Sequence, residues 1–474
     1  MKQHNAGKER EGRDVFVKRL TPYSRAFISV AFIIAIILTG IHLYNPNLGS
    51  GANVSRVSEP ALAQAQSSSS NPQADPSVSS SAAMSAPTTK IASGPSPIDP
   101  KLVASIITFP VSYGSGASPP GSPFAYDSGN GYMYVTVGQS STTNWYVAAL
   151  EGTNVALISV PAECTHLAYD SGNGYIYAGC LGYVEIISGT SVVGSISVSL
   201  VNGDAPNVAY NPSNGYVYAA EPSSNLYVIS GTSLAATLAT TGGNAGATYN
   251  PSNGYIYTAS GGTVYVTSGT SSYTTLTLPD CAGYAPTVTG NMTYNPSNGD
   301  IYVAFSAGSE FEVDLISGTS VAASCINLPQ LAGVPTPDSM FVYNPVNHDM
   351  YMDVPASSTS SPYYTIPSYV FSGTSIVTPL VISSAYAYSY ANIAQGNGYV
   401  YMSAMVMRNG AYQPVALALS NESVVGEVGL GETVSTVDVG PAYPIAYDPS
   451  NGYLYVAYSD EYSQGSISVL SFGS

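Results

Sequence analysis

A segment of about 12 residues recurs eight times in the chain, and this repeat constrains the fold more than any other feature of the sequence. The copies share an Asp or Asn, an Asn-Gly pair and a following Tyr-x-Tyr, with small departures in the fifth to seventh copies. They span residues 124–135, 167–178, 208–219, 247–258, 292–303, 341–352, 392–402 and 445–456. Their turns are 39 to 54 residues apart, which is typical of the four-stranded blade of a propeller.

Each copy predicts a β-hairpin. The side chain of Asn or Asp can accept a hydrogen bond from the backbone two residues further on, and Pro fixes φ at the position between them. The Asn-Gly pair supplies the turn positions that require a positive φ. The flanking segments alternate between apolar and polar residues, which predicts half-buried strands. A second hairpin, with Ser-Gly-Thr-Ser at its turn, follows in most copies, as in residues 183–198, 226–239 and 313–328. Two hairpins make a unit of four strands.

The two ends of the repeat region predict a closed ring. The last unit stops at residues 466–474 without a fourth strand, and residues 102–110 resemble the fourth strands of other units. Pairing these segments leaves no blade incomplete. We therefore expect an all-β fold, an eight-bladed β-propeller over residues 102–474 closed by an N-terminal strand; seven blades are the alternative.

The repeats resemble the YVTN-type β-propeller repeat of archaeal and bacterial surface-exposed proteins. Tyr134-Val135-Thr136 carries the first three letters of that family's signature, and the resemblance covers about residues 102–474. The other copies read YAG, YAA, YTA, YVA, YMD, YMS and YVA. Members of the family more often have seven blades. The resemblance implies a non-catalytic recognition or surface role and names no ligand.

The charge is distributed unevenly. The net charge is -17, and after residue 101 the chain holds 22 of its 28 Asp and Glu beside a single base, Arg408. Nucleic acid and anionic membrane surfaces require clustered Lys and Arg, so neither is expected as a partner. Such a surface loses most of its charge below about pH 4, which suits an acidic exterior. Adaptation to high salt is the weaker explanation, because it would require more carboxylate than this. Secretion at neutral pH is the remaining alternative.

The first hundred residues predict an anchor and a spacer. Seven of the 11 basic residues lie in 1–25, and 26–44 is an uncharged apolar span of 19 residues, close to the roughly 20 residues of a transmembrane helix. The positive-inside rule puts the N-terminus in the cytoplasm and the propeller outside. A small-x-small site at 61–63 leaves cleavage as an alternative to a retained anchor. Residues 45–101, rich in Ser, Pro and Ala, predict a disordered, flexible linker.

Aromatic loop residues are the candidates for ligand binding. The loop segments 356–369 and 383–390 are long, and flat rings with polar rims can stack on sugars or bind peptides. The candidates are Tyr363, Tyr364, Tyr386, Tyr388 and Tyr390. Alternatively, Tyr386, Tyr388 and Tyr390 are simply the residues on one face of an inner strand and do not bind a ligand. Trp145, the only tryptophan, is interpreted as packing.

Signals for metal, cofactor and catalytic chemistry are weak. His166 and His348 lie far apart without zinc spacing, and we expect no metal site and no cofactor. Glu310, Glu312 and Asp314 share a strand face and could bind Ca²⁺, although a solvated face is the simpler interpretation. Asp127, Asp170 and Asp448 exchange with Asn among the copies, so they are interpreted as turn residues. A Ser-His nucleophile pattern is lacking, so paired carboxylates are the remaining route to an enzyme.

The four cysteines all lie in the part predicted to be exported, which suggests disulfides. In the second copy of the repeat, residues 167–178, opposed residues should have numbers that sum to about 344, as Cys164 and Cys180 do, and we expect their Cα atoms to lie about 4.4–6.8 Å apart. Cys281 and Cys325 pair by elimination only. Asn53, Asn291 and Asn421 begin glycosylation sequons.

Together these features predict a single-pass cell-membrane protein with an extracellular propeller. It would act as a non-catalytic binding or adhesion module for an unknown protein or glycan partner at the cell surface. A structural cell-envelope component is the second hypothesis, and a secreted lyase or hydrolase is the third.

Overall fold

The structure is a computed structural model. It describes residues 100–109, 123–138, 144–199, 204–221, 225–240, 245–308, 310–328, 340–353, 367–381, 393–408, 411–420, 423–430, 444–459 and 465–472. The predicted segments 1–25 and 26–44, and the linker up to residue 99, lie outside these residues. No helix in the described part of the chain is long and apolar enough to cross a membrane.

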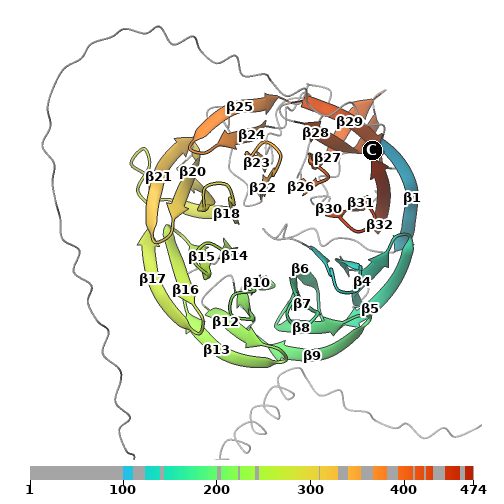
Figure 1. The fold of residues 1–474 in the computed structure, drawn as a ribbon, viewed down its shortest axis with the longest axis horizontal. Helices are drawn as coiled ribbons and strands as arrows, with labels where there is room; N and C mark the ends of the chain where they lie inside the picture. Colours follow the sequence, from blue (N-terminus) through green and yellow to red (C-terminus); the bar gives the residue numbers. More distant parts are fainter. Residues whose placement is uncertain are drawn as a thin grey trace, which may run out of the picture. The chain divides into compact units, whose positions relative to one another are not determined.

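The described strands form eight four-stranded antiparallel sheets, the blades, which succeed one another around a ring (Figure 1). Blade 1 consists of β2 (Phe124–Tyr126), β3 (Met133–Gly138), β4 (Trp145–Glu151) and β5 (Asn154–Val160). Blade 2 consists of β6 (Cys164–Asp170), β7 (Tyr175–Cys180), β8 (Tyr183–Ser188) and β9 (Ser191–Ser197). Blade 3 consists of β10 (Asn207–Asn211), β11 (Tyr216–Ala220), β12 (Asn225–Ser230) and β13 (Ser233–Ala239). Blade 4 consists of β14 (Ala245–Asn250), β15 (Tyr255–Ser260), β16 (Thr263–Ser268) and β17 (Ser271–Thr277).

The second half of the ring repeats this order. Blade 5 consists of β18 (Thr287–Tyr294), β19 (Asp300–Ala307), β20 (Glu310–Ser317) and β21 (Ser320–Asn327). Blade 6 consists of β22 (Met340–Tyr343), β23 (Met350–Asp353), β24 (Pro367–Ser372) and β25 (Ser375–Val381). Blade 7 consists of β26 (Ile393–Gly396), β27 (Tyr399–Arg408), β28 (Ala411–Ser420) and β29 (Ser423–Gly429). Blade 8 consists of β30 (Ile445–Asp448), β31 (Tyr453–Ser459), β32 (Gly465–Phe472) and β1 (Pro100–Phe109).

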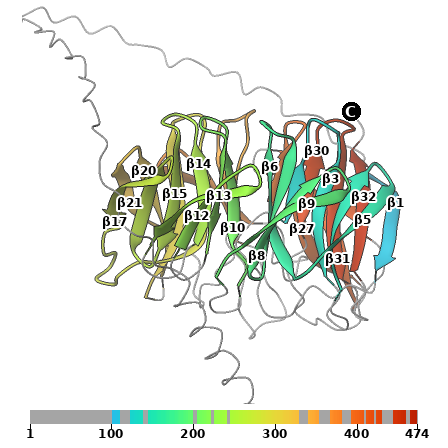
Figure 2. The same ribbon diagram turned by 90° about the horizontal axis from the view of Figure 1, so that it is seen from below.

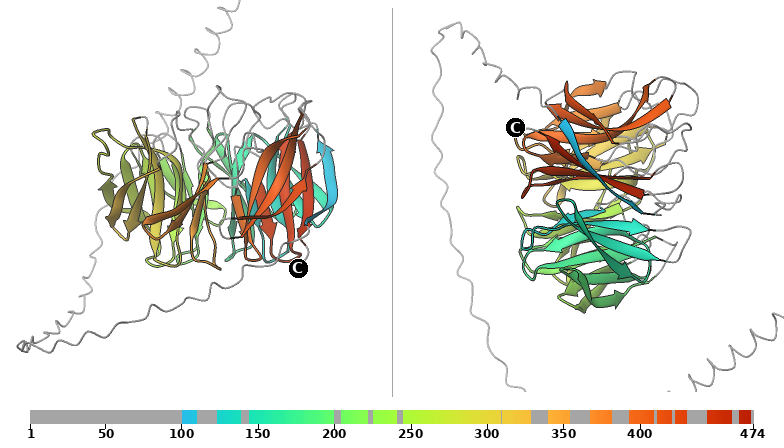
Figure 3. Two further views of the ribbon diagram at one scale, coloured as in Figure 1. Left: turned by 90° about the horizontal axis from the view of Figure 1, so that it is seen from above. Right: turned by 90° about the vertical axis from the view of Figure 1, so that its right-hand side faces the viewer.

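The ring closes as the ends of the repeat region predict. β1 is the outermost strand of blade 8 and pairs antiparallel with β32, from Pro100 opposite Phe472 to Phe109 opposite Gly465 (Figure 3). The count of eight blades is confirmed, and the seven-bladed alternative is wrong for this chain. The linker boundary needs a small correction, because residues 100 and 101 already belong to β1.

Eight hydrophobic clusters lie between the blades, one at each interface. The cluster of Tyr455, Val469 and Phe124, for example, joins blade 8 to blade 1. The second and third strands are buried along nearly their whole length, as in β7, β15 and β20. The expectation of half-buried strands is wrong for these strands, because each blade is covered on both faces by its neighbours.

The ring has two different faces. Turns between first and second strands and between third and fourth strands lie together on one side, which we call the turn face. Connections between second and third strands, and from one blade to the next, lie on the opposite side, the loop face. Figure 2 shows the ring from its edge, with the C-terminal end of β32 at the turn face. Pro100 is paired beside that end, so β1 begins at the turn face and runs to the loop face.

The repeated motif explains how neighbouring blades are held. The second tyrosine of each Tyr-x-Tyr is buried, and its hydroxyl donates to a glycine carbonyl oxygen in the next blade's Ser-Gly-Thr or equivalent turn at 2.7–3.1 Å. The same hydroxyl accepts a hydrogen bond from a turn asparagine of its own blade, as from Asn130 to Tyr134 at 3.1 Å. The donors described are Tyr134, Tyr177, Tyr218, Tyr257, Tyr302 and Tyr455. Burial raises the pKa of Tyr134 to about 12, which keeps its hydroxyl protonated and able to donate.

We expect Tyr455→Phe to lower the free energy of unfolding by about 1–3 kcal/mol. Its hydroxyl donates to the Gly152 carbonyl oxygen at 3.1 Å and so joins blade 8 to blade 1. Phe keeps the ring packing but leaves that carbonyl without this donor. Tyr453→Phe, two residues earlier on the same strand and less buried, is the matched control and should change stability by less than about 0.5 kcal/mol. Denaturant unfolding measures both, and equal effects would contradict the role of this hydrogen bond.

Candidate functional site

The loop face carries the long connections in which the sequence predicts binding residues. Tyr363 and Tyr364 lie between Asp353, the end of β23, and Pro367, the start of β24. Tyr386, Tyr388 and Tyr390 lie between β25 and β26. All five are outside the described residues, so their role stays a prediction. The described strand ends that flank both segments lie on the loop face of blades 6 and 7.

The connection from blade 4 to blade 5 is described in full and is held rigidly. Cys281 and Tyr284 pair through both backbone groups, with N–O distances of 3.1 and 2.9 Å. Between them Ala282 and Gly283 have φ values of 50° and 83°, which form a tight turn and favour Gly at the second position. A disulfide joins Cys281 to Cys325 on β21. The Cys281–Tyr284 turn is therefore fixed to the outer strand of blade 5.

Tyr284 projects from this turn on the loop face. It is 56% exposed, one of the most exposed large side chains among the described residues. Its ring lies on the backbone of Gly308 in the β19–β20 connection, where a Cβ atom would come within 2.9 Å of the ring. Gly308 is thus required for this contact. An exposed aromatic ring on a fixed turn loses little conformational entropy on binding.

One acidic residue lies in the same connection as Tyr284, and another follows the β19–β20 connection that the Tyr284 ring contacts. Asp280 is exposed and precedes the disulfide, and the partly exposed Glu310 begins β20 two residues after Gly308. A carboxylate accepts two or more hydrogen bonds, and an aromatic face stacks on the apolar face of a sugar ring. This arrangement of ring and acids can bind a polyhydroxylated or cationic group.

Two further carboxyls of the same strand are buried, which corrects the interpretation of a solvated face. Glu312 is 2% exposed and Asp314 is fully buried. Asp314 accepts a hydrogen bond from the Cys325 N–H at 2.8 Å, while among the described residues its second oxygen and Glu312 Oε2 have no hydrogen-bond partner. Burial raises the pKa of both carboxyls, that of Asp314 to about 6. Glu185 of β8 occupies the position in blade 2 that is equivalent to Asp314. Its carboxyl has a side-chain partner, because Ser195 Oγ donates a hydrogen bond to it at 2.6 Å.

The predicted Ca²⁺ ligands do not converge as a set. Within the described residues, the group of potential ligand atoms lying within 4.8 Å of one another is that of Cys281, Glu312 and Cys325. The two cysteines are joined in a disulfide, so their sulfurs are not thiolate ligands. Glu310 and Asp314 are not members of this group. We therefore build no metal chemistry on this strand.

The remaining candidates have structural roles. Asp127, Asp170 and Asp448 each accept a backbone N–H two residues on, at 2.8 Å, as the turn interpretation requires. Trp145 packs at the interface of blades 1 and 2. The two propeller histidines are also accounted for: His166 is buried beside Thr165 Oγ1, and His348 replaces the turn glycine with φ of 64° and contacts Tyr343 Oη at 2.7 Å.

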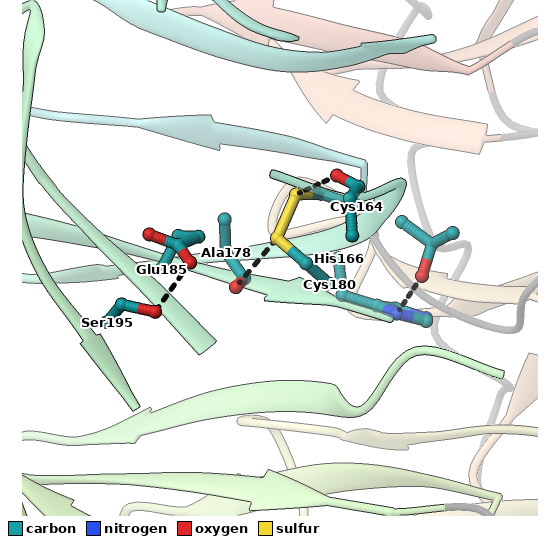
Figure 4. Close-up of a disulfide and its surroundings, with 8 residues drawn as sticks. Cys164, His166, Ala178, Cys180, Glu185 and Ser195 are labelled. Carbon is teal, nitrogen blue, oxygen red and sulfur yellow. Dashed lines mark hydrogen bonds between the residues drawn. A yellow bond between two sulfur atoms is a disulfide. The ribbon is translucent and has the colours of Figure 1, made fainter. Parts of the chain in front are cut away.

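The structure pairs Cys164 with Cys180, at the loop-face end of the first hairpin of blade 2 (Figure 4). The register used to expect this pair is wrong by one residue, since Tyr169 opposes Ile176 and His166 opposes Gly179. A bulge between Cys164 and His166 restores the opposition of the two cysteines. Their Cα atoms are 3.8 Å apart, closer than expected. Each sulfur lies near a backbone carbonyl oxygen, of Ala162 or Ala178, at 3.4 Å.

The sequons remain predictions. Asn291 lies within β18, and the structure describes its backbone only. Asn53 and Asn421 lie outside the described residues.

Comparisons with known proteins agree with the fold. No family model and no curated protein matches the sequence. The C-terminal WD40 domain of Sif2 is similar in structure, with a TM-score of 0.51 and 8% identity, over 79% of this chain and 99% of that one. Hydrazine synthase of Kuenenia stuttgartiensis has a TM-score of 0.45 and 11% identity, over 75% of this chain and 98% of that one.

The sheet topology defines the class of protein. The described chain is an eight-bladed β-propeller of four-stranded blades, closed by its first strand. At 8% identity the likeness to Sif2 shows the fold alone. The resemblance to YVTN-type repeats stays a prediction from the repeat residues.

Proposed function

We propose that this propeller is a non-catalytic binding module at the cell surface that recognises a glycan, or the glycan of a glycosylated protein, through its loop face. The observation that carries the proposal is Tyr284, exposed on a turn that the Cys281–Cys325 disulfide holds in place. The ring supplies stacking area, and Asp280 and Glu310 supply acceptors for sugar hydroxyls.

Charge and burial support this class of ligand over the others. After residue 101 the chain has a single base, Arg408, which disfavours phosphate-rich ligands. A hydrolase or lyase would need an acid and a base that a polymer can reach. Glu312 and Asp314 are closed to solvent, which leaves Glu310 as the acid of β20 that a ligand can reach, together with the exposed Asp280.

We further propose that residues 26–44 anchor the protein in the membrane and that residues 45–99 space the propeller from it. The apolar span and the basic residues before it support this topology. The linker joins the ring at Pro100, on the turn face. The loop face is thus on the opposite side of the ring from the attachment point, where it is free to meet a partner.

We expect Tyr284→Ala to weaken glycan binding by about tenfold or more, since a stacked ring contributes on the order of 1–3 kcal/mol. A glycan array probed with the full-length protein at pH 3.5 and pH 7 identifies the ligand, and titration of the variant measures the loss. Tyr273→Ala is the matched control. Tyr273 is 58% exposed but lies on β17, near its turn-face end. Equal losses in both variants, or no saturable binding by the wild type, would contradict the proposal.

One observation favours the second candidate, a structural envelope component. Among the described strands, β9, β13 and β17 are the outermost strands of their sheets, and none of the three contains a charged residue. Charges commonly protect such edges from pairing with other chains. Self-association that rises with concentration, measured by light scattering on the same samples, would support this candidate.

A further inference from the structure

The Cys281–Cys325 disulfide lies beside a buried acid that has no evident structural partner. Both sulfurs and a carboxylate oxygen of Glu312 lie within 4.8 Å of one another. Glu312 is 2% exposed, and its Oε2 has no hydrogen-bond partner in the part of the chain that the structure describes. A buried polar atom without a partner destabilises the fold and calls for an explanation. The position of Glu312 against the two sulfurs supplies one.

The two cysteine residues differ in their exposure to solvent. Cys281 is 1% exposed and belongs to the blade 4 to blade 5 connection. Cys325 belongs to the outer strand β21 and is not among the buried residues. An external thiolate can therefore approach Cys325, and the sulfur that leaves is the buried one of Cys281.

We propose that this disulfide exchanges with external thiols and that Glu312 is the proton donor to the leaving Cys281 sulfur. The thiolate attacks Cys325 Sγ and forms a mixed disulfide as the Cys281–Cys325 bond breaks. Cys281 Sγ leaves with the electron pair and takes the proton of the Glu312 carboxyl, which becomes a carboxylate. A second external thiolate then attacks the external sulfur of the mixed disulfide. Cys325 is released as a thiolate, and the two external thiols end as one disulfide.

The burial of Cys281 is the reason why its leaving sulfur needs a proton donor. An unpaired thiolate at the site of Cys281 would be a charge without water, which is costly. Proton transfer from the neutral Glu312 carboxyl turns that thiolate into a thiol and moves the charge to the carboxylate, which is the weaker base because an ordinary Glu has a pKa of about 4.3 and an ordinary Cys one of about 8.5. The other acids nearby are Glu310 and Asp314 on the same strand and the exposed Asp280 beside Cys281. The Asp314 carboxylate instead accepts a hydrogen bond from the Cys325 backbone N–H. Asp314 is not in the group of atoms within 4.8 Å of one another that contains the two sulfurs.

The second disulfide provides an internal comparison. Cys164 is 7% exposed and Cys180 is fully buried, so neither sulfur faces solvent freely. The structure therefore assigns the exchange to one disulfide of the two. Reduction of the Cys281–Cys325 disulfide would release the Cys281–Tyr284 turn from β21.

The test uses the full-length protein with dithiothreitol between pH 5 and 8, quenched by alkylation and read by peptide mass spectrometry. Cys281–Cys325 should be reduced at least tenfold faster than Cys164–Cys180. Glu312→Gln, which cannot donate as an acid, should slow the first reaction at least tenfold. Asp314→Asn, which also removes a buried carboxyl, should change it less than threefold. The rate per dithiothreitol thiolate should fall as Glu312 ionises in the wild type and stay constant in Glu312→Gln.

Three results would overturn the proposal. Cys164–Cys180 could be reduced first, which would show that exposure of Cys325 does not control access. Glu312→Gln could react as fast as the wild type, which would remove the proton donor. Both variants could slow equally, which would show that only the stability of blade 5 matters.

Discussion

Removal of residues 1–109 is expected to lower the thermal midpoint of the propeller by on the order of 5–10 °C or to make it aggregate, whereas removal of residues 1–99 is expected to leave it unchanged. The two truncations differ only in β1. Without β1, the edge of β32 is unpaired from Gly465 to Phe472. Blade 8 is then the one blade with three strands, at the point where the chain's two ends meet.

Calorimetry and light scattering on the two truncated proteins measure this effect. Unchanged stability of the 110–474 chain would show that the contacts between blades 8 and 1, including the Tyr455 to Gly152 hydrogen bond, suffice to close the ring. A loss of stability in the 100–474 chain would place a stabilising role in residues 1–99.

The second large effect concerns the dependence of stability on pH. We expect Asp314→Asn to stabilise the protein at pH 7 by on the order of 2–3 kcal/mol and to have little effect at pH 3. Burial raises the pKa of Asp314 from 3.8 to about 6 in the folded state. The folded state therefore binds this proton more tightly than the unfolded state does. Stability rises as the pH falls from about 6 to about 4, and the full penalty of the buried charge applies above pH 6.

Urea unfolding at pH 3 and pH 7 measures the difference between wild type and variant. Asp280→Asn, at an exposed position in the neighbouring connection, is the control and should behave like the wild type at both pH values. A variant less stable than the wild type at pH 7 would show that the ionised Asp314 holds a specific partner. Glu312 adds to the same trend, because its pKa is also raised by burial. The chain is thus expected to gain stability in acid, as the excess of carboxylates suggests.

The fold was readable from the sequence because its strongest signals are local. Each Asx turn and each Ser-Gly-Thr turn specifies a hairpin without reference to the rest of the chain. The missing last strand and the extra first strand then specify closure. Register is less local: a five-residue turn leaves it uncertain by a residue or two, and the bulge at Thr165 has no signature of its own in the sequence.

The candidate site was harder to predict because it depends on contacts between blades. Glu310, Glu312 and Asp314 alternate along β20 as solvent-facing acids would, but a third strand has a neighbouring blade on each face. Alternation therefore does not identify an exposed side there. Tyr284 was missed altogether. Its signal was the short run Cys281-Ala-Gly-Tyr284, in which a turn-forming glycine and a disulfide cysteine flank an aromatic residue.

The way β1 closes the ring also determines how the molecule would respond to force. Any tension on residues 1–99 enters the ring at Pro100 and is directed along β1 when the pull is away from the turn face. The hydrogen bonds between β1 and β32 are perpendicular to the strands. Such a pull therefore shears the whole set of bonds together rather than opening them one after another. A ligand held at the loop face under flow would load the ring through this one strand, and the load would be shared along the pairing from Pro100 to Phe109.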